Sequence, residues 1–218
     1  MTEAVLFDMD GVVLEGRGTP QSVYDRAAER AVAEVGAEPS ERALSLLRRH
    51  GYVTVARGCS RIGVDPRGFW RLKEKHACEA CHERLREGKR GVYDDTEAIA
   101  DVADETTTGL VSNNRQDTVE FVAEHFDIPF DVVEGRLPTP EGFGRRKPFP
   151  DALVGASEEV GADPEDAVYV GDRRKDTVAA RAAGMEPAYL RRPHNEDEPF
   201  PSGAVYELGS LEELRRVL

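Results

Sequence analysis

The chain has 218 residues, of which 42 are acidic and 29 are lysine or arginine, and its formal net charge is -13. This length fits one domain, or a core domain with a smaller inserted one. The negative average field disfavours nucleic acid as a partner. No apolar run of the sequence approaches the ~20 residues that a membrane span needs, so we expect no membrane partner.

Only five of the 29 basic residues are lysines. This acid-rich, lysine-poor composition resembles that of cytoplasmic proteins from salt-loving archaea, where concentrated salt screens the repulsion between like charges. The first expected strand begins at Ala4 and leaves no room for a signal peptide. The three cysteines, an odd number, do not form a secreted disulfide framework. We therefore expect a halophilic protein in the cytoplasm.

The first half of the chain predicts one strand followed by a helical insertion. Residues 4–8 form a short apolar run that ends in an acid, which is typical of a buried parallel strand. Helical spacing of apolar residues follows at 24–35, 41–50 and 69–85, with a possible strand only at 52–56. We expect a helical cap domain at residues 16–90 and a core domain made of residues 1–15 and 91–218.

The second half alternates between helical and strand patterns. Helices are predicted at residues 96–103, 113–125, 150–160 and 176–183, the last one capped by Gly184, and strands at 107–112, 130–134, 167–170 and 187–190. A polar loop at 191–202 and a terminal helix at 211–218 complete the chain. This rhythm predicts an α/β fold with a doubly wound parallel sheet and helices on both faces.

Two carboxylates end the first strand. Asp8 and Asp10 lie two residues apart, so in a strand both side chains would point to one face. Carboxylates about 4 Å apart repel by ~4 kcal/mol at an effective dielectric constant of about 20, so they need a cation beside them. The alternative is a solvated Asp-x-Asp-Gly turn, which ends at Gly11.

Ser112, Asn113 and Lys147 are candidates for holding an anion. Ser112 and Asn113 are expected to follow a strand and open a helix, where backbone N–H groups and the helix dipole bind anions; plain helix capping is the alternative. Lys147 precedes Pro148, which predicts a stiff turn that fixes the ammonium group. Solvent exposure is the usual fate of a lysine, and the neighbouring arginines are rival cations.

Two further acids follow a later strand. Asp172 comes directly after the strand expected at 167–170, and Asp176 follows four residues on, near a helix start. Mg²⁺ takes about six oxygen ligands, commonly one or two carboxylates with water and substrate phosphate, so Asp8 and Asp172 would suffice. Asp176 could instead serve only as a charge in the first helical turn.

With these four motifs in this order, the chain resembles the haloacid dehalogenase-like superfamily of hydrolases. Residues 8–13 correspond to its first motif, Ser112 to the second, Lys147 to the third, and Gly171-Asp172 with Asp176 to the fourth. The insertion resembles the helical cap of the phosphoglycolate phosphatase-like branch. Dehalogenases of this superfamily lack the second acid, whereas members with Asp-x-Asp are mainly phosphatases and phosphomutases.

The resemblance implies a magnesium-dependent phosphatase that acts on a small phosphorylated metabolite. Asp8 would be the nucleophile that forms an aspartyl-phosphate, and Asp10 the general acid and base. Mg²⁺ would be held by Asp8, the Asp10 backbone carbonyl and Asp172, with Asp176 orienting a bound water. Phosphate oxygens would be held by Ser112, the Asn113 backbone and Lys147. A phosphomutase of the same fold and a non-catalytic binding protein remain alternatives.

Two features of the expected cap are open to more than one interpretation. Cys78, Cys81 and His82 would share one helix face, which permits a zinc site with a fourth ligand from elsewhere, or simple packing of buried thiols. Arg17, Arg57 and Arg61 are candidates for contacts with a substrate carboxylate or a second phosphate. Phosphoglycolate, sugar phosphates and nucleotides are all possible substrates.

Overall fold

A computed structural model describes residues 2–218. The chain divides into two compact units. The first unit contains the chain up to Gly18 together with Arg90–Arg136 and Arg145–Leu218, and the second contains Thr19–Lys89 and Leu137–Gly144. Within residues 2–218 there is no helix with the length and apolarity that crossing a bilayer requires.

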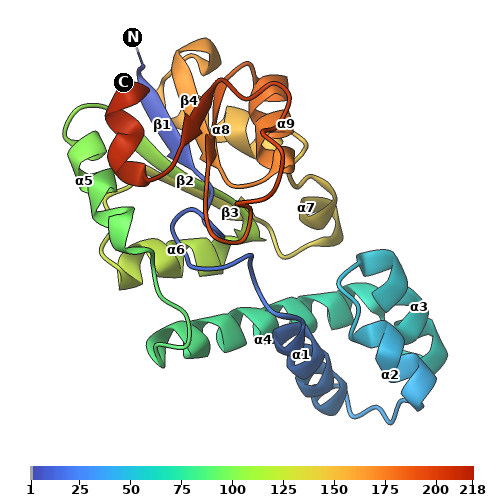
Figure 1. Ribbon diagram of the computed structural model, residues 1–218. Helices are drawn as coiled ribbons and strands as arrows, with labels where there is room; N and C mark the ends of the chain where they lie inside the picture. Colours follow the sequence, from blue (N-terminus) through green and yellow to red (C-terminus); the bar gives the residue numbers. More distant parts are fainter. Residues whose placement is uncertain (1) are drawn as a thin grey trace. The chain divides into compact units, whose positions relative to one another are not determined.

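The first unit is built on a six-stranded, fully parallel sheet (Figure 1). The strands are β1 (Ala4–Phe7), β2 (Thr107–Arg115), β3 (Val132–Arg136), β4 (Ala167–Gly171), β5 (Glu186–Leu190) and β6 (Tyr206–Leu208). Their order is β3-β2-β1-β4-β5-β6, so the chain winds one way from β1 and then the other way from β4. The prediction of a doubly wound α/β fold is confirmed. In such sheets, ligands bind where the winding reverses, beyond the carboxyl ends of the strands.

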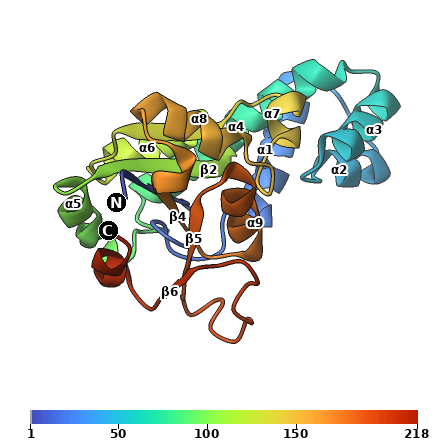
Figure 2. The ribbon, with the colours of Figure 1, turned by 90° about the horizontal axis from the view of Figure 1, so that it is seen from above.

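Helices cover both faces of this sheet. α5 (Ala98–Ala103) and α6 (Gln116–His125) lie on one face, and α8 (Asp151–Val160) and α9 (Arg174–Ala183) on the other (Figure 1). The short 3₁₀ helices are η1 (Asp94–Glu97), η2 (Pro164–Asp166) and η3 (Leu211–Arg216). Because both faces are covered, every residue of β1 is fully buried, which explains its continuous apolar sequence. The long connection between β5 and β6 is the red-orange loop in Figure 2.

The second unit consists of helices. They are α1 (Gln21–Glu34), α2 (Glu41–Leu47), α3 (Tyr52–Ile62), α4 (Pro66–Arg86) and α7 (Pro140–Gly144). Its core centres on Trp70, which is 1% exposed, and Phe143 of α7 meets Trp70 edge-on with ring centroids 5.2 Å apart. The sequence gives no periodic signal for α7, because its five residues are too few to show one.

Two local predictions were wrong. The strand β2 continues to Arg115, which pairs with Arg136 beyond a bulge, so Ser112 and Asn113 lie within the strand and α6 begins only at Gln116. The possible strand at 52–56 belongs to α3, whose buried side is formed by residues at helical spacing such as Val55 and Cys59. The terminal segment is the 3₁₀ helix η3, and the short strand β6 was not predicted.

Candidate active site

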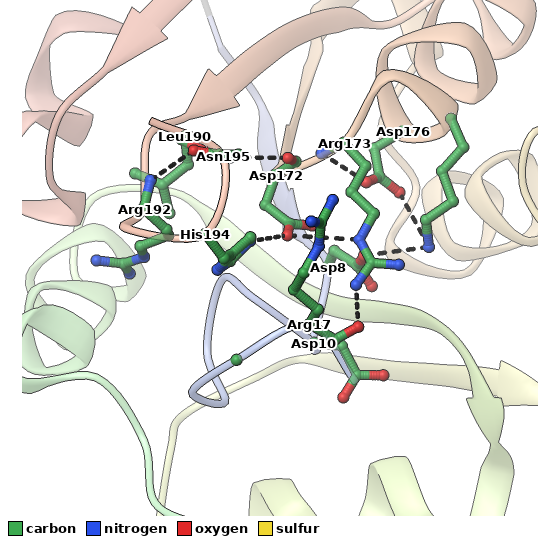
Figure 3. Close-up of polar contacts among 12 residues, drawn as sticks. Asp8, Asp10, Arg17, Asp172, Arg173, Asp176, Leu190, Arg192, His194 and Asn195 are labelled. Atoms are coloured by element: carbon green, nitrogen blue, oxygen red, sulfur yellow. Dashed lines mark hydrogen bonds and ion pairs between the residues drawn. The ribbon is translucent and has the colours of Figure 1, made fainter. Parts of the chain in front are cut away.

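Three buried carboxylates meet at the carboxyl end of the sheet (Figure 3). Asp8 follows β1 and Asp172 follows the neighbouring strand β4, while Asp176 stands in the first turn of α9. One oxygen of each lies within 4.8 Å of one oxygen of the other two. All three residues are at most 1% exposed. This group is called the carboxylate triad below.

Two glycines allow the triad to assemble. Gly11 has a φ angle of 89°, and a Cβ atom on it would lie 2.2 Å from Asp172 Oδ2. A Cβ atom on Gly171 would lie 2.3 Å from the Cβ of Asp176. A residue with a side chain at either position would push the triad apart. Steric hindrance therefore explains why both motifs have glycine at these positions.

Lys147 is buried against the triad. Its Nζ lies 2.9 Å from Asp8 Oδ1 and 2.9 Å from Asp176 Oδ1, and its side chain is 1% exposed. The ammonium also donates to the Val111 carbonyl at 3.3 Å and to the hydroxyl of Tyr169. This position agrees with the prediction that the ammonium group of Lys147 is held in place. It disagrees with the alternative that Lys147 is exposed to solvent.

The backbone of Lys147 is fixed by Asn113. The Asn113 side chain accepts a hydrogen bond from the Lys147 N–H at 2.7 Å and donates one to the Lys147 carbonyl at 3.1 Å. The Lys147–Pro148 peptide bond is cis. Asn113 was predicted to bind phosphate through its backbone; its side chain has this second, structural task, which the sequence did not indicate.

A second lysine, which was not predicted from the sequence, approaches the triad from α9. The Nζ of Lys175 lies 3.7 Å from Asp8 Oδ2 and 3.8 Å from Asp176 Oδ1, and its side chain is 28% exposed. Arg173 adds a third cation, with Nε 3.6 Å from Asp172 Oδ2. Both residues lie between the two acids of the fourth motif in the sequence. This position in the sequence could have indicated that they lie near the site.

The surroundings shift the pKa values of the triad in different directions. Burial would raise the pKa of Asp8, but the charges of Lys147 and Lys175 outweigh it and lower that pKa below its usual value. Burial raises the pKa of Asp176, and nearby Asp8 raises it further against the opposing charge of Lys147. Burial, followed by the charges of Asp8 and Asp176, raises the pKa of Asp172 to about 7. Of the three acids, Asp8 is therefore the one whose ionised form these surroundings favour.

Asp10 lies outside the triad and pairs with an arginine. Its Oδ1 is 2.7 Å from Nη1 of Arg90, whose Nε donates to the Glu15 carbonyl at 2.6 Å. The expected metal contact of Asp10 was through its backbone carbonyl, and that contact stays a prediction. Nothing in the local sequence points to Arg90, because 80 residues separate it from Asp10.

The loop after β5 returns to the triad (Figure 3). His194 Nε2 lies 2.5 Å from Asp172 Oδ2. The Asn195 side chain donates to the carbonyls of Asp172 at 2.8 Å and Leu190 at 2.9 Å, so it fixes this loop to the ends of β4 and β5. From its sequence this segment was predicted only to be a polar loop.

Ser112 is buried near the end of β2, where its hydroxyl oxygen accepts a hydrogen bond from the Asn114 N–H at 3.2 Å. The predicted anion site at a helix start is wrong for this residue, because α6 begins four residues later. Its predicted role with phosphate therefore depends on the hydroxyl and on the strand end, and it stays a prediction.

The triad fits a divalent cation. Within residues 2–218, Asp172 Oδ1 is a buried carboxylate oxygen without a hydrogen-bond partner, and the three acids of the triad each bring one oxygen within 4.8 Å of the others. Uncompensated oxygens of this kind are the ligands that hard divalent cations prefer. In the same residue range, the triad is the only group of three or more acids, histidines or cysteines close enough to share an ion. Cys78, Cys81 and His82, which were considered for zinc, do not form such a group within residues 2–218, and both cysteines are buried.

The three arginines considered as substrate contacts differ in their surroundings. Arg17 is more than half exposed and pairs with Glu198 at 2.7 Å. Arg57 and Arg61 are exposed residues of α3 in the second unit. None of the three has a contact that assigns it a substrate group.

The site consists of buried acids at the ends of two neighbouring parallel strands, with lysines packed against them. This arrangement is typical of α/β enzymes whose active site lies at the carboxyl edge of the sheet. More particularly, the chain belongs to the haloacid dehalogenase-like hydrolases, and the match to this family spans residues 2–184. The resemblance drawn from the four motifs is confirmed.

Curated relatives agree with this family, and a solved structure shares the fold. The chain is 28% identical to N-acetylmuramic acid 6-phosphate phosphatase of Pseudomonas putida over 231 aligned positions, which cover 99% of the chain and 95% of the relative. It is 42% identical to phosphoglycolate phosphatase 1 of Pseudomonas aeruginosa over 60 residues, but these cover only 28% of the chain and 22% of that relative. The fold matches CbbY from Rhodobacter sphaeroides in complex with phosphate, with a TM-score of 0.67, 23% identity, and coverage of 98% and 96% of the two chains.

Proposed function

We propose that the chain is a magnesium-dependent phosphatase that hydrolyses a small phosphomonoester through an aspartyl-phosphate on Asp8. Family membership and the names of its phosphatase relatives support a hydrolase of phosphomonoesters. The observation that carries the mechanism is the state of Asp8. It is a buried, ionised carboxylate with one oxygen held by Lys147 and the other, Oδ2, without a hydrogen bond.

The chemistry follows from these two oxygens. Asp8 Oδ1 accepts the Met9 N–H at 2.8 Å, which leaves Oδ2 as the atom that attacks phosphorus. The bond from phosphorus to the leaving oxygen breaks, and Asp10 donates a proton to that oxygen. Asp10 then takes a proton from water as the water attacks the phosphorus of the aspartyl-phosphate, which releases inorganic phosphate and restores Asp8.

The triad residues Asp8, Asp172 and Asp176 would hold Mg²⁺, together with the Asp10 backbone carbonyl. When bound, the ion supplies positive charge that offsets the repulsion between these acids and the phosphate of the substrate. Lys147 keeps Asp8 ionised and oriented, and Ser112 and the Asn113 backbone are proposed as further phosphate contacts.

The proposed substrate is a small phosphorylated metabolite. Two relatives are named for phosphoglycolate and N-acetylmuramic acid 6-phosphate, so these compounds and other sugar phosphates are the first to test. A phosphomutase would use the same residues, but it would return the phosphoryl group to the sugar instead of releasing inorganic phosphate.

A phosphate-release screen over small phosphomonoesters tests the proposal, with Mg²⁺ or EDTA and at both low and molar KCl. We expect release that requires Mg²⁺, no turnover for Asp8→Asn, and a loss of at least ~100-fold for Asp10→Asn, the scale of a missing general acid. A single turnover in ¹⁸O-labelled water should place the label on the Asp8 side chain if water attacks the carboxyl carbon, and on phosphate if it attacks phosphorus. Full activity of Asp8→Asn would refute the nucleophile, and a bisphosphorylated intermediate would favour the mutase.

A further inference from the structure

The two lysines at the triad differ in how many hydrogen-bond acceptors of the protein surround their ammonium groups. Lys147 has four acceptors around its ammonium group: one oxygen each of Asp8 and Asp176, the Val111 carbonyl and the Tyr169 hydroxyl. An ammonium has only three hydrogens, and the side chain is 1% exposed. Lys147 therefore has no hydrogen left for a substrate unless one of these contacts breaks.

Lys175 is in the opposite situation. Its two nearest carboxylate oxygens, on Asp8 and Asp176, lie at 3.7 and 3.8 Å, which is an ion-pair distance but beyond a hydrogen bond. Its side chain is 28% exposed, against 1% for Asp8. The ammonium thus stands between solvent and the buried acid, on the side of the oxygen that has no hydrogen-bond partner within residues 2–218.

We propose that Lys175 is a second phosphate-binding cation of this site, which meets the phosphoryl group on the Oδ2 side of Asp8. The inference rests on the proposed phosphatase function. A phosphoryl group that approaches Oδ2 comes within reach of an ammonium 3.7 Å from that oxygen, and the hydrogens of Lys175 can turn to its oxygens. In this arrangement Lys147 orients Asp8 and Asp176, and Lys175 adds donors for the incoming anion.

The small number of lysines in the chain also supports this assignment. Lysines number five among 29 basic residues, and two of those five reach the same pair of acids. A lysine ammonium is a compact charge with three rotatable donors, which suits a phosphoryl group whose oxygens move during the reaction. The neighbouring Arg174 is exposed and makes no contact with the triad, so it is a matched control on the same helical turn.

The rival role for Lys175 is competition with the metal. An ammonium near Asp8 and Asp176 could simply neutralise these acids, and it would then weaken the binding of a cation to the triad. The two roles predict opposite results. Removing a phosphate contact weakens phosphate binding, whatever happens to metal binding. Removing a mere competitor tightens metal binding and leaves phosphate binding unchanged.

Isothermal titration calorimetry of the full chain separates them, with inorganic phosphate titrated at saturating Mg²⁺ and Mg²⁺ titrated without phosphate. For Lys175→Met we expect the Kd for phosphate to rise at least about tenfold, as for a lost charge-assisted hydrogen bond. Lys175→Arg should recover part of this loss, and Arg174→Met should stay within about twofold of the wild type, since it removes the same charge without the contact. In the phosphate-release assay, Lys175→Met should raise KM more than it lowers kcat.

Equal phosphate affinity of the wild type and a folded Lys175→Met would overturn this inference alone. Tighter Mg²⁺ binding with unchanged phosphate binding would overturn it in favour of the competing role. Equal weakening in Arg174→Met would also overturn it, because a nonspecific charge effect would then suffice. A wild type that neither binds nor releases phosphate contradicts the proposed phosphatase function itself, and the inference about Lys175 with it.

Discussion

Asp172 combines complete burial with a strongly shifted pKa, and this links the stability of the protein to pH and to metal. Its pKa rises from 3.8 to about 7 because of burial and then because of Asp8 and Asp176. The folded protein therefore binds more protons than the unfolded chain between these two values. The resulting stabilisation is full below the unfolded pKa and is lost as pH rises through the folded one.

We expect the metal-free protein to lose thermal stability as the pH rises from 6.5 to 8, by about 2–4 °C for each kcal/mol that is lost. Burial and the charges of Arg17 and Arg173 lower the pKa of His194, which is in contact with Asp172. Differential scanning calorimetry in EDTA measures the slope. The substitution Asp172→Asn should make the melting temperature depend less on pH. Adding Mg²⁺ to the wild-type protein at pH 8 should raise its melting temperature again. The same slope in both proteins would contradict the assignment.

The site shows which residues a sequence can predict. Asp8 and Asp172 follow apolar runs that form neighbouring parallel strands, and the fold alone then brings their side chains together. Arg90 and His194 reach Asp10 and Asp172 across 80 and 22 positions of sequence, through a linker and a loop without periodic pattern. Their places depend on tertiary packing, which apolar spacing does not encode.

At the scale of the elements, α4 supports the end of α2 through a buried lysine. Lys73 is 1% exposed, and its ammonium donates to the carbonyls of Leu47 and Arg49. These carbonyls stand at and just beyond the carboxyl end of α2, where no further helical turn supplies N–H donors. One side chain of α4 therefore does the work of a helix cap for its neighbour.

Lys73→Met should lower the free energy of unfolding by about 1–3 kcal/mol, since buried carbonyls lose a charged donor. Urea or guanidinium denaturation, followed by circular dichroism, measures the change. Lys75→Met is the control, because Lys75 lies on the exposed side of the same helix and should stay within about 0.5 kcal/mol of the wild type. An equal effect of both substitutions would point to net charge and not to this cap.

The element boundaries that the sequence missed have a common cause. The strand β2 continues through Ser112 and Asn113 to Arg115 because β3 pairs with its end, although serine and asparagine are typical of helix caps. The continuous apolar runs of β1 and β4 and the helical spacing of α9 were predictable, since burial on one or both sides repeats along them. α7 and β6 have no such pattern and form through contacts with partners distant in sequence, such as Trp70 for α7.

For the whole molecule, the charge distribution sets how stability depends on salt. Among the acidic residues within positions 2–218, Asp8, Glu74, Asp172 and Asp176 are the only buried ones. The other acids of this range face water wholly or in part, and the chain has 42 acids against 29 lysines and arginines to neutralise them. The folded chain therefore holds like charges closer together than the unfolded chain does, and this repulsion opposes folding.

Raising KCl from 0.1 to 2 M should increase the melting temperature by at least about 5 °C, because the screening length falls from about 10 Å to below 3 Å. Salt also weakens surface ion pairs such as Arg48–Glu29, but exposed pairs contribute little, so relief of repulsion should prevail. Calorimetry at saturating Mg²⁺ keeps the triad constant during the salt series, and an uncharged osmolyte at matched osmolarity controls for general solvent effects. A melting temperature that falls with KCl, or an equal rise in the osmolyte, would contradict an adaptation of this acidic surface to salt.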